Sequence, residues 1–132
     1  MNQQSYQTTV PVLPEDIDEQ NHVNNMVYLR WIQEIAIAHW RVLASAEAQK
    51  AISWVVLRHE IDYKTPAVLA DEIQLVTWVG KATRLTFERF TEIKRKSDGQ
   101  LLVRARTLWC PIDPKTGKPT RVPPDVRAQF ST

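Results

Sequence analysis

Acidic side chains, a histidine and three asparagines occur together in residues 15–25, immediately before the most apolar segment of the chain. An aspartate carboxylate can activate water as a general base, or attack a carbonyl carbon as a nucleophile. A nearby histidine can orient that carboxylate or polarise a substrate. Asp18 and His22 are therefore the first candidates for chemistry.

Asn24 and Asn25 lie at the junction between this polar stretch and the apolar segment. Asparagine is a preferred N-cap residue, because its side chain accepts a hydrogen bond from an unpaired backbone N–H of the first helical turn. A helix should therefore begin at Asn24 or Asn25. Helix N-termini stabilise an oxygen on which negative charge develops. A carboxylate beside such a helix end suits a hydrolytic reaction.

A purely structural interpretation of the same residues is equally open from their types and spacing. Asp16 and Asp18 can form Asx-turns, Asn24 can serve only as a cap, and His22 can be a turn residue bonded to backbone. These residues alone do not favour one interpretation over the other.

Residues 16–28 follow the pattern D-x-D-x-x-x-H-V-N-N-x-x-Y, with every fixed position matched from Asp16 to Tyr28. In this pattern the chain resembles the hotdog-fold acyl thioesterases, of the 4-hydroxybenzoyl-CoA thioesterase and acyl-ACP thioesterase superfamily. Many relatives have glycine where this chain has Asn21, and asparagine also tolerates left-handed backbone. Weaker agreement at residues 62–72 and 113–123 extends the resemblance to about residues 6–126.

The resemblance implies hydrolysis of an acyl thioester of coenzyme A, or of acyl carrier protein, to the free acid and a thiol. It implies no metal and no bound cofactor, with coenzyme A only as part of the substrate. Asp18 matches the catalytic carboxylate, acting as general base or nucleophile, and the backbone N–H of Asn25 is the expected donor to the thioester oxygen. His22 is a second catalytic candidate.

Substrate binding is expected to involve further residues of the motif and positive charges elsewhere. We expect Asn24 and Tyr28 to contact the substrate. The phosphates of coenzyme A need cationic neighbours, for which Arg84 is our candidate. The other candidate cations are Lys64, Lys94 and Arg95.

Two other functions remain open for a chain with this motif. A non-catalytic hotdog acyl-binding protein would keep the pocket without turnover. A hotdog dehydratase would act on a hydroxyacyl chain and release no thiol.

Hydrophobic periodicity predicts one α+β domain over residues 1–132, with a strand at residues 6–12 that Pro11 places at a sheet edge. From Asn25 to about Ala46, apolar residues recur at helical spacing and fill other faces too. We expect this helix to be buried on most sides, except at Arg30, Gln33, Glu34 and Arg41.

Further strands are predicted at residues 52–64, 72–80, 83–96 and 101–112, with turns at 49–51, 80–81 and 97–99. In the first of these strands, the apolar face should consist of Val55, Leu57, His59, Ile61 and Tyr63. The resemblance implies a hotdog fold, in which a five- or six-stranded antiparallel sheet wraps around the long central helix. It also implies a homodimer or homotetramer with active sites at the subunit interface.

Composition narrows the functional classes. The net charge is +2, and acidic and basic residues are interspersed, so nucleic-acid binding is not indicated. The single cysteine, Cys110, cannot form an internal disulfide, and no signal-peptide pattern opens the chain, so a cytoplasmic location is expected. No uncharged apolar run reaches the length of a membrane span. Cys110 and His39 are expected in the core.

Overall fold

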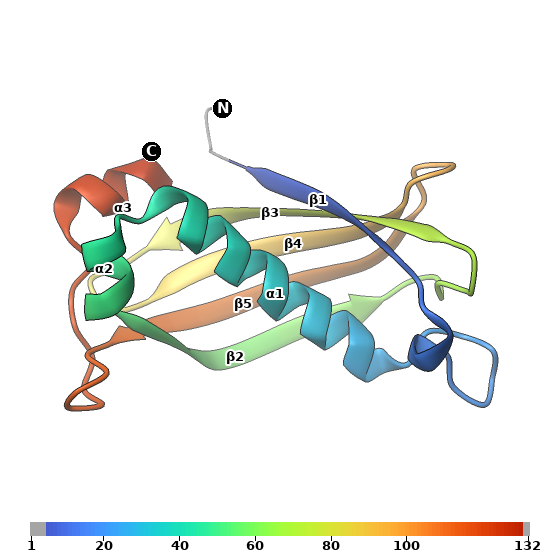
Figure 1. Cartoon of the computed structure of the whole chain (residues 1–132), viewed down its shortest axis with the longest axis horizontal. Helices are drawn as coiled ribbons and strands as arrows, with labels where there is room; N and C mark the ends of the chain where they lie inside the picture. The colour runs from blue at the N-terminus through green and yellow to red at the C-terminus, as the bar shows by residue number, and fades with distance from the viewer. Residues whose placement is uncertain (1–4, 131–132) are drawn as a thin grey trace.

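Five antiparallel strands and one long helix form the framework of the protein in a computed structural model that describes residues 5–130 (Figure 1). The strands are β1 (Tyr6–Pro11), β2 (Ser53–Tyr63), β3 (Glu72–Ala82), β4 (Phe87–Arg95) and β5 (Leu101–Ile112). Their order in the sheet is β1-β3-β4-β5-β2, so β1 and β2 lie at its two edges. The predicted α+β class and the edge position of the first strand are confirmed.

Helix α1 (Asn25–Leu43) lies along one face of the sheet (Figure 1). Two short helices, α2 (Ala46–Ala51) and α3 (Pro124–Phe130), lie at one end of the sheet. A 3-10 turn, η1 (Pro14–Asp16), lies at the opposite end, just before the motif loop. The motif loop and the β3–β4 turn are therefore at opposite ends of the molecule.

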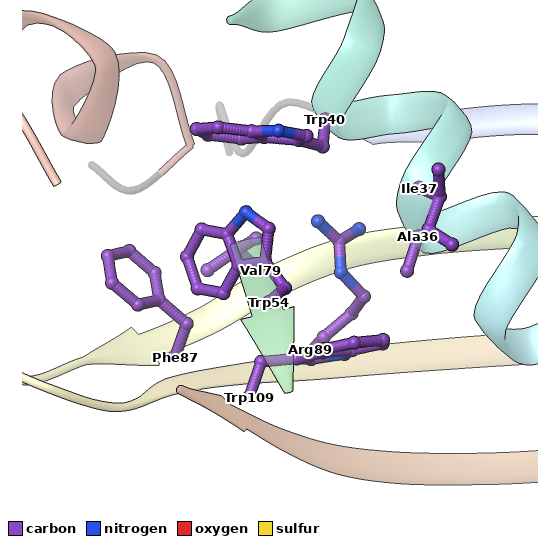
Figure 2. A pocket seen from close by; sticks show the side chains of 8 residues that line it. All are labelled: Ala36, Ile37, Trp40, Trp54, Val79, Phe87, Arg89 and Trp109. Atoms are coloured by element: carbon purple, nitrogen blue, oxygen red, sulfur yellow. The ribbon is translucent and has the colours of Figure 1, made fainter. Parts of the chain in front are cut away.

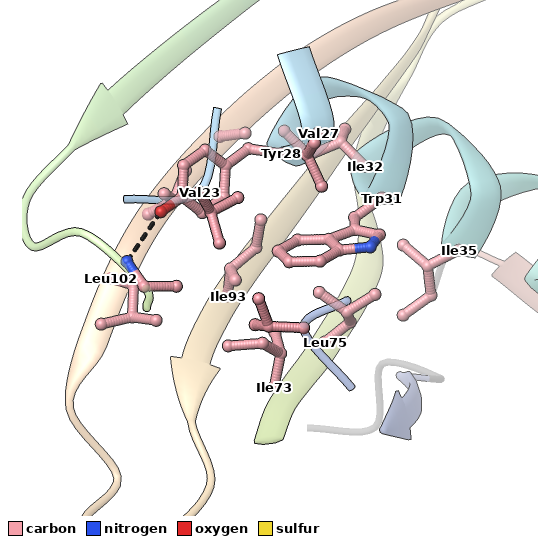
Figure 3. Close-up of a cluster of buried hydrophobic side chains, with 14 residues drawn as sticks. Val23, Val27, Tyr28, Trp31, Ile32, Ile35, Ile73, Leu75, Ile93 and Leu102 are labelled. Atoms are coloured by element: carbon pink, nitrogen blue, oxygen red, sulfur yellow. Dashed lines mark hydrogen bonds between the residues drawn. The ribbon is translucent and has the colours of Figure 1, made fainter. Parts of the chain in front are cut away.

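The core lies between α1 and the concave side of the sheet, as Figure 3 shows. Side chains at helical spacing point from α1 onto the strands, and those of Tyr28, Trp31, Ile32 and Ile35 are each at most 2% exposed. Burying one such side chain contributes roughly 1.5–3 kcal/mol, which fixes the helix on the sheet. They pack against strand residues that include Ile73, Leu75, Ile93 and Leu102.

The outer face of α1 is more apolar than a solvated surface requires. Arg30, Glu34 and Arg41 are exposed as predicted, but so are Met26, Ile37 and Val42, at 76%, 41% and 63%. The expectation of a helix buried on most sides is therefore wrong for a single chain, because the sheet covers only one side of α1.

Strand β2 departs from the predicted alternation. Its register against β5 shifts between Val56 and Arg58, which makes Leu57 part of a β-bulge that exchanges the two faces of the strand. Trp54 and Val56 are consequently half-buried, whereas Val55 and Leu57 are 38% and 56% exposed. The predicted inward position of Val55 and Leu57 is wrong, while His59 and Ile61 beyond the bulge are half-buried as expected.

The turns were predicted with mixed success. The hairpin between β4 and β5 is confirmed, with Gly99 at φ +72°. Gly80 does not form a turn, because β3 continues to Ala82; a Cβ at this position would lie 2.6 Å from Glu88 Oε1 and from the Phe90 ring. Residues 49–51 belong to α2 rather than to a turn, since the Ser45 hydroxyl caps that helix through the Ala48 N–H at 3.1 Å.

No helix in the part of the chain that the structure describes has the length and hydrophobicity needed to cross a bilayer.

Candidate active site

The carboxylate of Asp18 is held by the backbone of the loop that precedes α1. Its Oδ1 accepts hydrogen bonds from the N–H groups of Gln20 and His22, at 2.9 and 3.4 Å. The Asp18 N–H donates in turn to the His22 carbonyl at 2.9 Å. Asn21 has φ 64°, a left-handed conformation that asparagine tolerates, and this lets the loop reverse within four residues. Among the described residues, none donates a hydrogen bond to Asp18 Oδ2.

Asp16, the first acid of the motif, is a structural residue. Its side chain is 2% exposed, and its Oδ2 accepts the Leu13 N–H at 2.9 Å. Its Oδ1 accepts from the guanidinium of Arg30 at 3.3 Å, and its carbonyl accepts the Asn24 N–H at 2.9 Å. Asp16 thereby fastens the loop to the first turns of α1. The structural interpretation holds for this aspartate.

The start of α1 is as predicted. Asn24 is the N-cap, and its Oδ1 accepts the N–H of Met26 at 2.9 Å. The helix then begins at Asn25, whose own N–H has no acceptor among the described residues. This N–H lies at the positive end of a helix of 19 residues. It is free to bind an oxygen from outside the chain.

A cleft of about 510 Å³ brings the motif residues together. Asp18, His22, Asn24, Asn25 and Tyr28 all line it. The facing wall is the segment that follows β2, and it consists of Tyr63, Lys64, Thr65 and Pro66, with Val103 from β5. We did not predict Tyr63, Thr65, Pro66 and Val103 as site residues, although the family-like segment 62–67 was the signal that could have identified most of them.

The candidate cations for coenzyme A divide between the two ends of the protein. Lys64 lines the cleft, is exposed, and has no ion-pair partner among residues 5–130. Arg84 lies in the turn between β3 and β4, at the opposite end of the sheet, and does not line this cleft (Figure 1). Lys94 forms an ion pair with Glu92, and Arg95 forms ion pairs with Asp71 and Asp98. Within one chain the cleft is thus served by Lys64 and not by Arg84.

Tyr28 connects α1 to the facing wall of the cleft. Its hydroxyl accepts the buried N–H of Ala67 at 2.8 Å, drawn as the dashed line in Figure 3. Burial raises the pKa of this phenol above its ordinary value, although the hydrogen bond from Ala67 acts in the opposite direction. Tyr28 therefore positions the segment that contains Thr65 and Pro66, in addition to lining the cleft.

The remaining candidates from the sequence lie elsewhere. Cys110 is buried on β5, as expected of a small apolar residue. His39 is buried on α1, and its Nδ1 accepts a hydrogen bond from the Arg89 guanidinium at 3.0 Å. In residues 5–130, no three His, Cys, Asp or Glu side chains come together as a group that could bind a metal ion.

The sequence and the fold are similar to those of known thioesterases. A family model described as the thioesterase-like superfamily matches residues 12–130. The long-chain acyl-CoA thioesterase FadM of Escherichia coli (strain K12) is 27% identical over 129 residues, covering 94% of this chain and 96% of FadM. The chloroplastic acyl-[acyl-carrier-protein] hydrolase FATB3 of Cuphea viscosissima is 26% identical over 82 residues. Those residues are 62% of this chain, which spans only 20% of the plant enzyme.

Among solved structures, Slr0204, a 1,4-dihydroxy-2-naphthoyl-CoA thioesterase from Synechocystis, superposes with a TM-score of 0.81 at 20% identity. The superposition covers 96% of each chain. The hotdog fold expected from the motif is thereby confirmed.

Proposed function

Because the chain belongs to the thioesterase-like superfamily, we propose that it hydrolyses an acyl thioester of coenzyme A to the free acid and coenzyme A. The observation that carries the proposal is that Asp18 and Asn25, the residue at the start of α1, line the same cleft. Coenzyme A enters as part of the substrate.

Asp18 supplies the base or the nucleophile in this proposal. Its Oδ1 is occupied by backbone N–H groups, which fix the orientation of the carboxylate, and Oδ2 is the oxygen available to a water molecule or to the thioester carbon. With Oδ2 acting as general base, water loses its proton to Asp18 as it attacks the thioester carbonyl. The carbon–sulfur bond then breaks, and the proton leaves with the thiol.

Asn25 supplies the electrophilic group through its backbone N–H. During attack on the thioester the carbonyl oxygen becomes negative, and a donor at the positive end of α1 stabilises it without reorganisation. His22 lies in the same cleft and holds Asp18 through its backbone. Its side chain is available to orient water or the thioester, which would make it a second catalytic group.

The relative that matches this chain over nearly its whole length supports coenzyme A as the carrier. FadM, which is named as an acyl-CoA thioesterase, matches this chain over nearly its whole length. The acyl carrier protein hydrolase matches over a fifth of its length only. Lys64 at the rim of the cleft gives a phosphate of coenzyme A a cationic neighbour. The matches to plant enzymes make acyl carrier protein the second candidate carrier. A cytoplasmic location, expected from the single cysteine, is part of the proposal.

A homodimer or homotetramer that joins sheets through β2 is also part of the proposal. Strand β2 is at the sheet edge, where its outer backbone groups are unpaired within the chain, and such edges are templates for pairing with another strand. Val55 and Leu57 on β2, and Ile37 on α1, are exposed apolar residues on these elements. A two-fold pairing of β2 with its copy would cover them.

Release of thiol from a series of acyl-CoA substrates tests the proposed function. Purified protein should release one thiol for each thioester consumed, and the same acyl groups on acyl carrier protein should be poorer substrates. Binding of acyl-CoA without thiol release would instead identify an acyl-binding protein. Loss of water from a hydroxyacyl-CoA without thiol release would identify a dehydratase.

A further inference from the structure

A second cavity lies under the C-terminal half of α1, and none of the residues that line it lines the Asp18 cleft. Figure 2 shows its lining side chains. Aromatic rings of Trp40, Trp54, Phe87 and Trp109 surround it, together with the side chain of Arg89. Its volume is about 40 Å³, and since one water needs roughly 10–15 Å³ by this measure, there is space for about three non-hydrogen atoms. Ile37, which is 41% exposed, lies at its border, so the cavity is reached from the surface beside α1.

Arg89 is an unusual residue for this place, because it is a buried cation. It is 6% exposed, and it rises from β4 with its guanidinium group toward α1 (Figure 2). Its Nη1 donates to His39 Nδ1 at 3.0 Å and to Thr77 Oγ1 at 3.1 Å, and both of these acceptors are neutral. No aspartate or glutamate of residues 5–130 forms an ion pair with it.

Apart from Arg89, the residues that line the cavity have no polar side-chain group other than indole N–H donors. The indole N–H groups of Trp54 and Trp109 are buried and have no acceptor in the described part of the chain. Indole and guanidinium groups have no acceptor atom of their own. Buried donors without an acceptor, and a buried cation without a counter-charge, both destabilise a folded protein. A ligand that brings acceptor oxygens and negative charge would remove all three defects.

We propose that this cavity binds a carboxylate at the far end of the acyl group, so that the preferred substrates are coenzyme A thioesters of dicarboxylic acids. A carboxylate has three non-hydrogen atoms, which matches the volume of the cavity. Its two oxygens can accept a pair of N–H groups from one guanidinium, with the indole N–H groups as additional donors. The apolar chain that connects carboxylate and thioester then lies against the aromatic rings. This inference rests on the proposed thioesterase function and the proposed dimer.

The dimer provides the route between the two sites. Within one chain the path is closed, because Tyr28, Trp31 and Ile35 fill the core between them. On β2, however, Tyr63 lines the cleft and Trp54 lines the cavity, nine positions or about 30 Å apart. In the proposed dimer, β2 pairs antiparallel with the β2 of the partner, and the two-fold axis passes through the middle of the strand. The Tyr63 end of one β2 strand then lies beside the Trp54 end of the other, with about 4.8 Å between the two strands. The cleft of each subunit then adjoins the cavity of its partner.

Thiol release from matched substrates tests the inference. Suberoyl-CoA and octanoyl-CoA have the same chain length and differ only in the terminal carboxylate. We expect kcat/KM to be at least about 10-fold higher for suberoyl-CoA, and Arg89→Met to abolish this preference by lowering the value for suberoyl-CoA alone. Arg89→Lys, which keeps the charge but loses the paired donors, should restore part of the preference.

Trp109→Phe keeps the aromatic ring and removes one donor, so it should lower the preference by a few-fold. This variant covers the case in which Arg89→Met does not fold. Equal kcat/KM values for the two substrates in the wild-type protein would overturn the inference and leave the thioesterase function intact.

Binding of free suberate gives a readout that does not depend on turnover. Its titration should change the tryptophan fluorescence of the wild-type protein, with a dissociation constant at least about 10-fold lower than that of Arg89→Met. This measurement still tests the cavity if the protein hydrolyses no thioester, a result that would refute the proposed function. No binding of suberate, or equal binding of inorganic phosphate, would overturn the carboxylate assignment.

Discussion

Removal of one hydroxyl group, in Tyr28→Phe, should reveal how α1 and the wall of the cleft are connected. The Tyr28 oxygen accepts the N–H of Ala67, a residue with 0% exposure, and the carbonyl of Ala67 accepts the N–H of Val23 in the motif loop. Phenylalanine fills the same space but leaves the Ala67 N–H buried and without an acceptor. Such a donor costs about 1–3 kcal/mol, so we expect the free energy of unfolding to fall by about 2 kcal/mol.

Urea unfolding followed by tryptophan fluorescence measures this loss, with protein concentration held constant because subunit association contributes to stability. Tyr63→Phe is the matched control. The Tyr63 side chain is 47% exposed and its hydroxyl makes no hydrogen bond to the described residues, so its removal should change stability by at most about 0.5 kcal/mol. The explanation fails if the two variants lose the same amount. The Tyr28 variant should also show a raised KM, since Thr65 and Pro66 line the cleft.

Three further predictions concern the helix start, the subunit interface and a buried histidine. Asn25→Pro deletes the backbone N–H at a helix position that proline tolerates, and it should lower turnover by roughly 10²-fold with an unchanged circular dichroism spectrum. Asn25→Ala keeps the N–H and should lose much less turnover. Equal losses in the two variants would assign the role to the side chain. Light scattering should show at least a dimer in solution, and a monomer that hydrolyses thioesters would contradict the proposed interface along β2. Burial, together with the adjacent Arg89 cation, lowers the pKa of His39 from 6.5 to about 4, so the unfolded chain binds a proton that the folded chain does not bind between these pH values. The stability that depends on His39 should therefore be complete above pH 6.5 and should fall by up to about 3 kcal/mol as the pH decreases toward 4. Urea unfolding of His39→Gln should show a smaller loss over the same pH range. Some pH dependence should remain in this variant, because burial also lowers the pKa of His59.

The local chemistry of the motif was predictable from the sequence because short-range rules determine it. An N-cap asparagine bonds the amide two residues later, and Asn21 accepts a left-handed backbone, whatever the rest of the chain does. The same holds for Gly99 in its tight hairpin. These positions set the path of the loop, so the side of the cleft that residues 18–28 form was predictable from the sequence, whereas the facing wall was not.

Long-range contacts determined the features that the sequence did not reveal. Both faces of β2 carry apolar residues, so the alternation of apolar and polar residues does not indicate the bulge at Leu57. Gly80 is required by the approach of Glu88 and Phe90 from the neighbouring strand, and not by a turn. Arg84 and Lys64 are both surface cations, and only the fold shows which end of the sheet each one occupies.

The buried position of Arg89 follows from strand alternation only after β4 has been placed in the centre of the sheet. Its neighbours on the same face, Phe87 and Thr91, are buried as well. A charged residue in such a row suggests a solvated face when the sequence is considered alone. The structure excludes that interpretation, because Phe87 and Ile93 on the same face of β4 belong to core clusters that also contain residues of α1. Strands β3 and β5 flank β4 on both sides.

The central claim is that the Asp18 carboxylate carries out the hydrolysis, and thiol release by Asp18→Asn tests it most directly. Asparagine keeps an oxygen that can accept the N–H groups of Gln20 and His22, so the loop should retain its conformation. Glu19 is exposed and follows Asp18 directly in the sequence. Glu19→Gln also removes one negative charge, so it is the control for the loss of charge in Asp18→Asn. We predict a loss of at least about 10²-fold in kcat for Asp18→Asn, near wild-type kcat for Glu19→Gln, and unchanged unfolding curves for both. Wild-type turnover by Asp18→Asn would remove Asp18 from the mechanism and contradict the proposed site.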